Sequence, residues 1–294
     1  MIWYGVAVIV GACSLDRQGE VIDAGIDYLS LTMRNDNPLT VAWHGAALAY
    51  LQDIAATGIE MNESRRLGYE GYSVGGSFVG VRDRDTTAIY SGERAKLAFD
   101  RLYRSDAHVS RLDVQVSFRF NVTNDNVAQV ARNSVSRANN TLSSARQRNA
   151  TLIEDLRGGA TCYIGTRKSE QFARIYNKDA ESGEKQYERV WRYEVQLKNK
   201  LAVKLAEQLA GNTYGREQHA LVFVRQWLRN RGVSVPWVAD AELLPLPTIT
   251  AQPTQVEAKL NWLRTQVRPT LRVLLKYGLR DAILEALGLD DREP

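Results

Sequence analysis

Cysteine and histidine are scarce in this chain of 294 residues, which has two cysteines and three histidines. Cys13 and Cys162 are too few for a disulfide framework or a cysteine-rich zinc site. His44, His108 and His219 lie too far apart in the sequence for an H-x-H or H-E-x-x-H metal motif. This composition fits a cytoplasmic protein best.

Long apolar runs and a strong net charge are also missing. The first 13 residues, MIWYGVAVIVGAC, are mostly apolar, but they are shorter than the roughly 20 residues that a membrane span needs. We expect residues 1–20 to form a buried strand or a loosely attached extension, with no membrane association. The 38 Lys and Arg residues exceed the 34 Asp and Glu residues only slightly, which weakly favours a polyanionic partner.

The hydrophobic periodicity predicts the α+β class, with an antiparallel sheet and helices packed on one face. Alternating residues indicate strands at Ile26–Met33 and Val109–Phe118, and glycine- and aromatic-rich residues 68–92 indicate a β-hairpin meander. Helical spacing is found over 40–57, 91–104 and 124–136. A hairpin and a further strand, over 161–178 and 191–198, complete this part of the chain.

The pattern changes to helices after about residue 200. Helices are predicted over 201–210, 214–231 and 255–288, and a linker over 233–254 contains four of the seven prolines. We therefore expect an N-terminal extension over 1–20, a catalytic domain over 21–200, and a smaller helical C-terminal domain or arm over 201–294.

Residues 163–181, YIGTRKSEQFARIYNKDAE, have an unusual polar alternation. Pairing the two arms around Arg167–Glu170 places Tyr163 opposite Arg174. Directly opposed and alternate residues share one face of a sheet. Tyr163, Arg174, Tyr176 and Lys178 would therefore project together.

Acidic residues occupy three further predicted strands. Asp27 lies in an otherwise apolar strand, where a lone carboxylate is costly without a cation. Asp113 and Glu194 belong to strands with one apolar and one polar face. Together the three carboxylates offer an all-oxygen set for Mg²⁺ or Mn²⁺.

A phosphodiester is a suitable substrate for such a face. A tyrosine has an ordinary pKa near 10, so it needs a nearby cation, metal or base before it attacks phosphorus. Arg174 and Lys178 are candidates to stabilise the charge of the transition state. The alternative is structural, because single tyrosines and Arg–Glu pairs commonly decorate solvated sheets.

Basic residues concentrate in the same part of the chain. Residues 157–204 contain 11 Lys or Arg against 6 Asp or Glu, which suits phosphate binding. The basic helix over 214–231 either lies against duplex DNA or packs on the catalytic domain. The candidate DNA-binding residues are Arg111, Arg167, Lys168, Arg192, Arg225 and Arg229.

Taken together, these segments resemble the Rep_trans family of replication initiation factors, which includes rolling-circle initiators of small plasmids and filamentous phages and relaxases of some integrative elements. The resemblance rests on IDYLSLTM, GYEGYSVGG, IYSGERAK, SRLDVQVSF, YIGTRKSEQFARIYNK and WRYEVQLK, which span about residues 26–198.

The resemblance implies a metal-dependent nickase that cuts one strand of an origin and stays joined to the 5′ end through tyrosine. Asp27, Asp113 and Glu194 fall at the expected metal positions. Tyr163 and Tyr176 both lie in motifs typical of the family, and Tyr163 is preferred because nearby Gly165 permits close approach of a DNA backbone.

Several partners and alternatives follow from the same resemblance. The implied partners are origin DNA with a single-stranded or hairpin nick site, a host helicase and a second copy of the chain. Alternative functions are a relaxase for conjugative transfer, a non-catalytic origin-binding protein and a nuclease that uses water. Plasmid replication, phage replication and conjugation begin with the same nick, so the residues do not separate them.

Overall fold

The computed structural model describes residues 19–104, 106–121, 150–154, 159–184, 187–211, 215–237 and 262–286. The predicted N-terminal extension, the predicted helix over 124–136 and most of the predicted linker lie outside these ranges. The chain divides into two compact units, residues 1–247 and residues 248–294. Each unit is described by itself.

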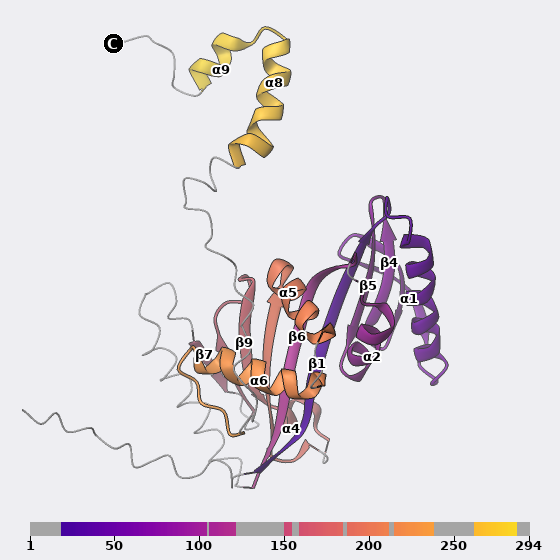
Figure 1. The fold of residues 1–294 in the computed structure, drawn as a ribbon, viewed down its shortest axis with the longest axis vertical. Coiled ribbons are helices and arrows are strands. Elements are labelled where there is room, and N and C mark those ends of the chain that lie inside the picture. Colours follow the sequence, from indigo (N-terminus) through magenta and orange to yellow (C-terminus); the bar gives the residue numbers. More distant parts are fainter. Residues whose placement is uncertain are drawn as a thin grey trace, which may run out of the picture. The chain divides into compact units, whose positions relative to one another are not determined.

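The first unit is built on one antiparallel sheet, to which ten strands within the described residues contribute (Figure 1). Their order across the sheet is β2 (Met61–Arg66), β3 (Tyr69–Val74), β4 (Ser77–Arg82), β5 (Asp85–Ser91), β1 (Gly19–Arg34), β6 (His108–Phe120), β10 (Val190–Lys198), β9 (Gln171–Asn177), β8 (Ala160–Ile164) and β7 (Ala150–Glu154). This arrangement confirms the predicted α+β class. The meander begins one strand earlier than predicted, because β2 is a polar, exposed edge strand without an apolar alternation.

The central strands divide sharply into an apolar and a polar face. Along β6, the residues Leu112, Val114, Val116, Phe118 and Phe120 alternate with Arg111, Asp113, Gln115, Ser117 and Arg119. Side chains of alternate residues point to opposite faces of a sheet, so β6 and β10 each present one apolar and one polar row. Every apolar residue in this β6 row is at most 1% exposed.

Helices cover the apolar face. Helices α1 (Thr40–Ala55) and α2 (Glu93–Leu102) pack at the β4–β5 end, and α5 (Asn199–Ala210) and α6 (Arg216–Arg229) pack on β1, β6 and β10 (Figure 1). Tyr90 on β5 donates a hydrogen bond from its hydroxyl to the Ala47 carbonyl of α1, at 2.9 Å. A short helix, α4 (Lys178–Ser182), follows β9 directly.

The described residues between 200 and 237 pack with the sheet unit, whereas the sequence predicted a domain boundary near residue 200. Phe223 of α6 is 1% exposed, and α6 contacts β1, β6 and β10. The first residues of the predicted linker also pack on the sheet: the Trp237 ring meets the Tyr193 ring edge-on, with 5.0 Å between centroids. The packed part of this unit therefore reaches at least Trp237.

The second unit has its described residues over 262–286. They form η3 (Leu263–Val267), α8 (Arg268–Lys276) and α9 (Arg280–Ala286). The sequence predicted one helix here, but the chain turns at Gly278, whose φ of 75° is readily adopted only by glycine. None of the helices in the described ranges is both long and apolar enough to span a bilayer.

The packing of α6 predicts that Phe223→Ala lowers the free energy of unfolding of the sheet unit by about 3–5 kcal/mol, because a fully buried aromatic side chain is lost. Leu275→Ala is the matched control, since Leu275 is 50% exposed, and it should change stability by less than about 0.5 kcal/mol. Urea unfolding followed by circular dichroism measures both. Equal stabilities of Phe223→Ala and the parent protein would show that α6 does not hold the sheet.

Candidate active site on the polar sheet face

The polar face of β6, β8, β9 and β10 brings its side chains into cross-strand rows. Tyr163 lies opposite Arg174, as the sequence predicted, and Arg174 lies opposite Glu194 on β10. A neighbouring row joins Thr161, Tyr176, Arg192 and Ser117. Adjacent strands are separated by about 4.8 Å, so each row forms a continuous line of polar groups across the sheet.

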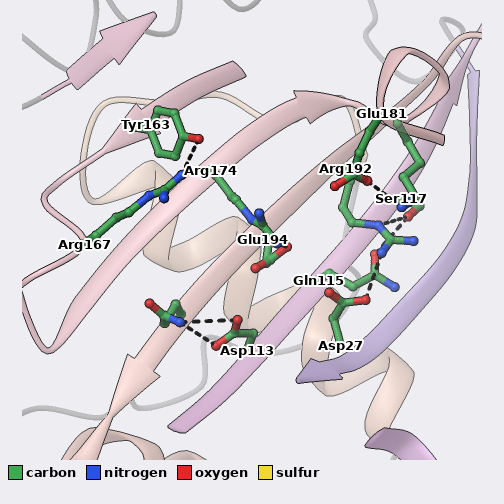
Figure 2. A network of polar contacts seen from close by, with 12 residues as sticks. Asp27, Asp113, Gln115, Ser117, Tyr163, Arg167, Arg174, Glu181, Arg192 and Glu194 are labelled. Carbon is green, nitrogen blue, oxygen red and sulfur yellow. Dashed lines mark hydrogen bonds and ion pairs between the residues drawn. The ribbon is translucent and has the colours of Figure 1, made fainter. Parts of the chain in front are cut away.

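A β-bulge brings Asp27 to this face. The pairing of β1 with β6 shifts between Ile26 and Tyr28: Ile26 lies opposite Val114, and Tyr28 lies opposite Asp113. The extra residue, Asp27, directs its carboxylate toward Arg192 on β10 (Figure 2). Bulges redirect side chains in this way near functional sites. Without the bulge, strand alternation would place Asp27 with Leu29 on the apolar face.

Asp113 and Glu194 form a buried carboxylate pair at the centre of the face. Both are at most 2% exposed. Asp113 lies opposite Gln196, and Glu194 lies opposite Gln115, so the two carboxylates are diagonal neighbours on adjacent strands.

Each carboxylate of the pair has its own arginine. Asp113 accepts hydrogen bonds from Arg111 Nε at 2.9 Å, from Arg111 Nη2, and from Gln196 Nε2 at 3.2 Å. Glu194 pairs with Arg174, with 2.9 Å between Oε2 and Nη2. Figure 2 shows Arg174 reaching toward Glu194 from the side of Tyr163.

The pKa of Glu194 is raised to about 7, chiefly by burial and then by the negative charge of Asp113, against the opposing effect of Arg174. The pKa of Asp27 is also raised, first by burial and then by Glu194, against the opposing effect of Arg192. Crowded carboxylates in a site of low dielectric constant resist ionisation. An additional positive charge nearby would favour their ionised forms.

A chain of hydrogen bonds extends from Asp27 away from the carboxylate pair. Arg192 contacts Asp27 through Nη1 at 2.8 Å and donates from Nε to Ser117 Oγ at 3.0 Å. Ser117 donates to Gln115 Oε1 at 2.9 Å, and Gln115 donates to Asp23 Oδ2 at 2.5 Å. This network fixes the orientation of Arg192. Lys96 of α2 ends it with an ion pair to Asp23 at 2.5 Å.

The two candidate tyrosines have different surroundings. Tyr163 is half-buried, and its hydroxyl accepts a hydrogen bond from Arg167 Nη2 at 2.7 Å. Tyr176 is 5% exposed, and the guanidinium of Arg174 lies 4.9 Å from the centre of its ring. Burial raises the pKa of Tyr176, as does the charge of Glu194, while Arg192 and Arg174 lower it. Tyr176 is therefore the tyrosine that interacts electrostatically with Glu194, Arg174 and Arg192.

Both tyrosines line a pocket of about 260 Å³. Its other lining residues are Ile153, Gly159, Ala160, Thr161, Arg174, Asn177, Ala180 and Glu181. The pocket thus gives access to Tyr176 in spite of its low exposure. Gly165, whose φ is 90°, lies outside this lining, and its backbone turn accounts for the glycine without invoking DNA.

The structure brings together two of the three predicted metal ligands. Among the described residues, no group of three or more His, Cys, Asp or Glu side chains is placed to hold one metal ion. Asp27 shares the face but is held by Arg192. The Asp113–Glu194 pair fits Mg²⁺ or Mn²⁺ in its chemistry, because such ions are commonly held by one or two carboxylates together with substrate phosphates.

The remaining predicted cations are spread over three places. Arg167 and Lys168 lie exposed in the turn between β8 and β9. Lys178 begins α4 and pairs with Glu181, with 2.5 Å between Nζ and Oε2. Arg225 and Arg229 belong to α6, on the helix-covered side of the sheet and away from the carboxylates.

Sequence reasoning missed several members of the hydrogen-bond network, among them Ser117 and Asp23. Ser117 follows Asp113 and Gln115 in the same alternating row of β6, so the periodicity offered a signal for it. Asp23 lies beyond two irregularities of β1 and had no such signal.

Comparison with known proteins identifies the family to which this chain belongs. The family model of Rep_trans, described as replication initiation factor, matches residues 107–287, which is more than half of the chain. The chain therefore belongs to the Rep_trans family of replication initiation factors.

One solved structure that resembles this fold is a rolling circle replication initiator protein from Geobacillus stearothermophilus, with 19% sequence identity and a TM-score of 0.46. The match covers 63% of this chain and 77% of that chain. No curated protein matches the sequence.

The raised pKa of Glu194 predicts a pH-dependent stability. Its folded-state pKa of about 7 exceeds the ordinary value of 4.5, so the folded protein binds more protons than the unfolded chain between these values. The free energy of unfolding therefore falls as the pH rises through this window. Glu194→Gln should lessen that fall by up to about 3 kcal/mol.

Chemical unfolding at a series of pH values between 5 and 8, with a chelator present, measures this difference. Glu63→Gln is the control, because Glu63 is an exposed carboxylate on the edge strand β2, and it should keep the pH dependence of the parent protein. A Glu194→Gln profile parallel to that of the parent would contradict the assignment.

Proposed function

We propose that this replication initiation factor is a rolling-circle initiator that nicks one strand of origin DNA through a tyrosine nucleophile. The observation that carries the proposal is the convergence of Tyr176, Arg174 and the Asp113–Glu194 pair on one sheet face beside an open pocket. Such a face combines a nucleophile with positive and negative groups suited to phosphoryl transfer.

We take Tyr176 as the nucleophile, although sequence reasoning preferred Tyr163; the raised pKa of Tyr176 means that it requires nearby positive charge before it attacks. Its phenol interacts electrostatically with Glu194, Arg174 and Arg192. The hydroxyl of Tyr163 is instead engaged by Arg167 near the hairpin turn. Tyr163 would then help to shape the pocket, and Arg167 would bind the DNA strand that enters it.

The chemical step conserves the phosphodiester bond. The Tyr176 oxygen forms a bond to phosphorus, the bond from phosphorus to the 3′ oxygen breaks, and the leaving 3′ oxygen takes up a proton. The phenolic proton passes to a basic group or to water before or during the attack. The product is a 5′-phosphotyrosine, which a free 3′ hydroxyl can later attack to rejoin the strand.

Arginines supply the positive charge that this step requires. Arg174 lines the pocket and has a side chain that is 32% exposed, so it can bind the non-bridging oxygens of the scissile phosphate. Arg174 and Arg192 also lower the pKa of Tyr176, opposing the effect of burial. Positive groups aimed at developing charge are a principal source of rate enhancement.

Asp113 and Glu194 are the residues that would hold a divalent cation. When bound there, Mg²⁺ or Mn²⁺ would polarise the phosphodiester and offset the charge of Glu194, which raises the pKa of Tyr176.

The exposed hairpin turn provides a second contact for DNA. Arg167 and Lys168 lie at its surface, a short distance along the strand from Tyr163. Cations of this kind bind phosphate groups without reading base sequence, and their contribution weakens as salt rises. The same nick serves replication and conjugative transfer, so a relaxase role shares this mechanism.

The mechanism predicts a covalent protein–DNA adduct. Labelled single-stranded oligonucleotides tiled over the replicon that encodes the protein are incubated with Mn²⁺ and resolved on denaturing gels. We expect one oligonucleotide to yield an adduct with the parent protein. Tyr176→Phe should abolish the adduct, because the attacking oxygen is missing, and Tyr163→Phe should retain it.

Other outcomes distinguish the competing functions. An adduct that is lost in Tyr163→Phe and kept in Tyr176→Phe would assign the nucleophile to Tyr163. Free 5′-phosphate ends without an adduct would indicate a nuclease that uses water. Salt-dependent binding without any cleavage would indicate a non-catalytic origin-binding protein.

Arg174→Gln gives an independent test of the charge argument. Loss of one positive group that stabilises a transition state typically lowers the rate by about 10²–10³-fold, and we expect a loss of that order in single-turnover nicking. Arg229→Gln is the control, because Arg229 is an exposed arginine on the opposite, helix-covered side. Equal losses in the two variants would contradict a specific role for Arg174.

A further inference from the structure

Arg111 occupies the lone pairs of Asp113 that a metal ion would need. Its Nε and Nη2 contact Oδ1 and Oδ2 of Asp113, so the guanidinium bridges both oxygens of the carboxylate. Gln196 Nε2 lies a further 3.2 Å from Oδ1. Because Asp113 is only 1% exposed, bulk solvent has little access to these oxygens. A cation can bind Asp113 fully only if Arg111 moves away.

Arg111 is placed so that it can leave. Its side chain is 35% exposed, compared with 32% for Arg174 and 11% for Arg192. The guanidinium lies 4.0 Å from the centre of the Tyr28 ring, whose surface can support it in more than one position. Arg174 contacts Glu194 through Oε2. It also lines the pocket beside Tyr176, so in the proposed function it serves the scissile phosphate where it lies and need not move.

The charges of the face favour the departure of Arg111 only when a cation and a DNA phosphate bind together. Three carboxylates, Asp27, Asp113 and Glu194, are each paired with one arginine. With all six groups ionised the set is neutral, so a divalent ion bound without an anion would add two buried positive charges at considerable cost. A DNA phosphate would offset one charge, and the departure of Arg111 from the buried site would remove another.

We propose that Arg111 is a displaceable counter-ion of Asp113, which restrains divalent-cation binding in the free protein and moves to a DNA phosphate when cation and DNA bind together. This proposal rests on the function proposed above and adds a regulatory role for Arg111. Binding of cation and binding of DNA then strengthen each other, and by linkage the effect is the same in both directions.

The test is the affinity of the free, full-length protein for Mn²⁺, measured by electron paramagnetic resonance of the unbound ion. Arg111→Gln should bind Mn²⁺ at least about tenfold more tightly than the parent protein, within the usual range of such couplings. Arg111→Lys should lie between the two, because a single ammonium group does not bridge both carboxylate oxygens. Arg119→Gln is the matched control, since Arg119 lies in the same row of β6 and pairs with Glu20 at 3.1 Å.

A second arm measures the coupling to DNA. A (dT)20 oligonucleotide should tighten Mn²⁺ binding to the parent protein by about fivefold or more. In Arg111→Gln this gain should largely disappear, because no arginine is released to bind phosphate. Adding Asp113→Asn to Arg111→Gln should abolish the tighter Mn²⁺ binding, which identifies Asp113 as the ligand that Arg111 covers.

Equal Mn²⁺ affinities for Arg111→Gln and the parent protein, with weaker binding in Asp113→Asn, would overturn the proposal and leave the metal site and the nicking function intact. Mn²⁺ binding to none of the variants would overturn it together with the metal site. Failure of the nicking function itself is read separately, from the adduct assay. Thermal melts of Arg111→Gln and Arg111→Lys confirm that the compared proteins are folded.

Discussion

The crowding of carboxylates on one buried sheet face is the constraint on which the rest of the site depends. Asp113 and Glu194 are almost completely buried and are diagonal neighbours. Each therefore requires a positive partner, because an unpaired buried charge destabilises a fold by several kcal/mol. Arg111 and Arg174 meet that requirement in the free protein. In the proposed mechanism, a bound cation and a DNA phosphate would share this balance of charge with the two arginines.

Because the sheet has one apolar and one polar face, different residues of the same strands stabilise the fold and form the candidate site. On β10, Tyr193, Val195 and Leu197 face the helix layer, while Arg192, Glu194 and Gln196 face the site. The helices α5 and α6 bury the apolar row and hold the strands in register. The polar row is thereby kept rigid without the need for a large hydrophobic contact of its own.

Much of this arrangement follows from sequence periodicity, and the departures have identifiable causes. The pairing of Tyr163 with Arg174 was predictable because hairpin register follows from the turn between the two arms. The place of Asp27 was not, because a bulge interrupts the alternation that would have assigned its face. The partners of Asp113 and Glu194 were also not predictable, since strand patterns show which residues share a face but not which of several arginines reaches which carboxylate. The edge strand β2 was missed because its exposed, polar residues have no buried side to produce a pattern.

The order of strands across the sheet has a consequence for synthesis of the protein. Arg192 and Asp27 are 165 residues apart in sequence, yet their ion pair crosses the centre of the site. Strand β10 is the last of the ten described strands in chain order, but it lies between β6 and β9 inside the sheet. Such non-local pairing forms late in folding. A ribosome-bound chain therefore has neither Glu194 nor the pairing of β10 with β6 and β9 until β10 has emerged. The candidate site forms only when most of the sheet unit has been made.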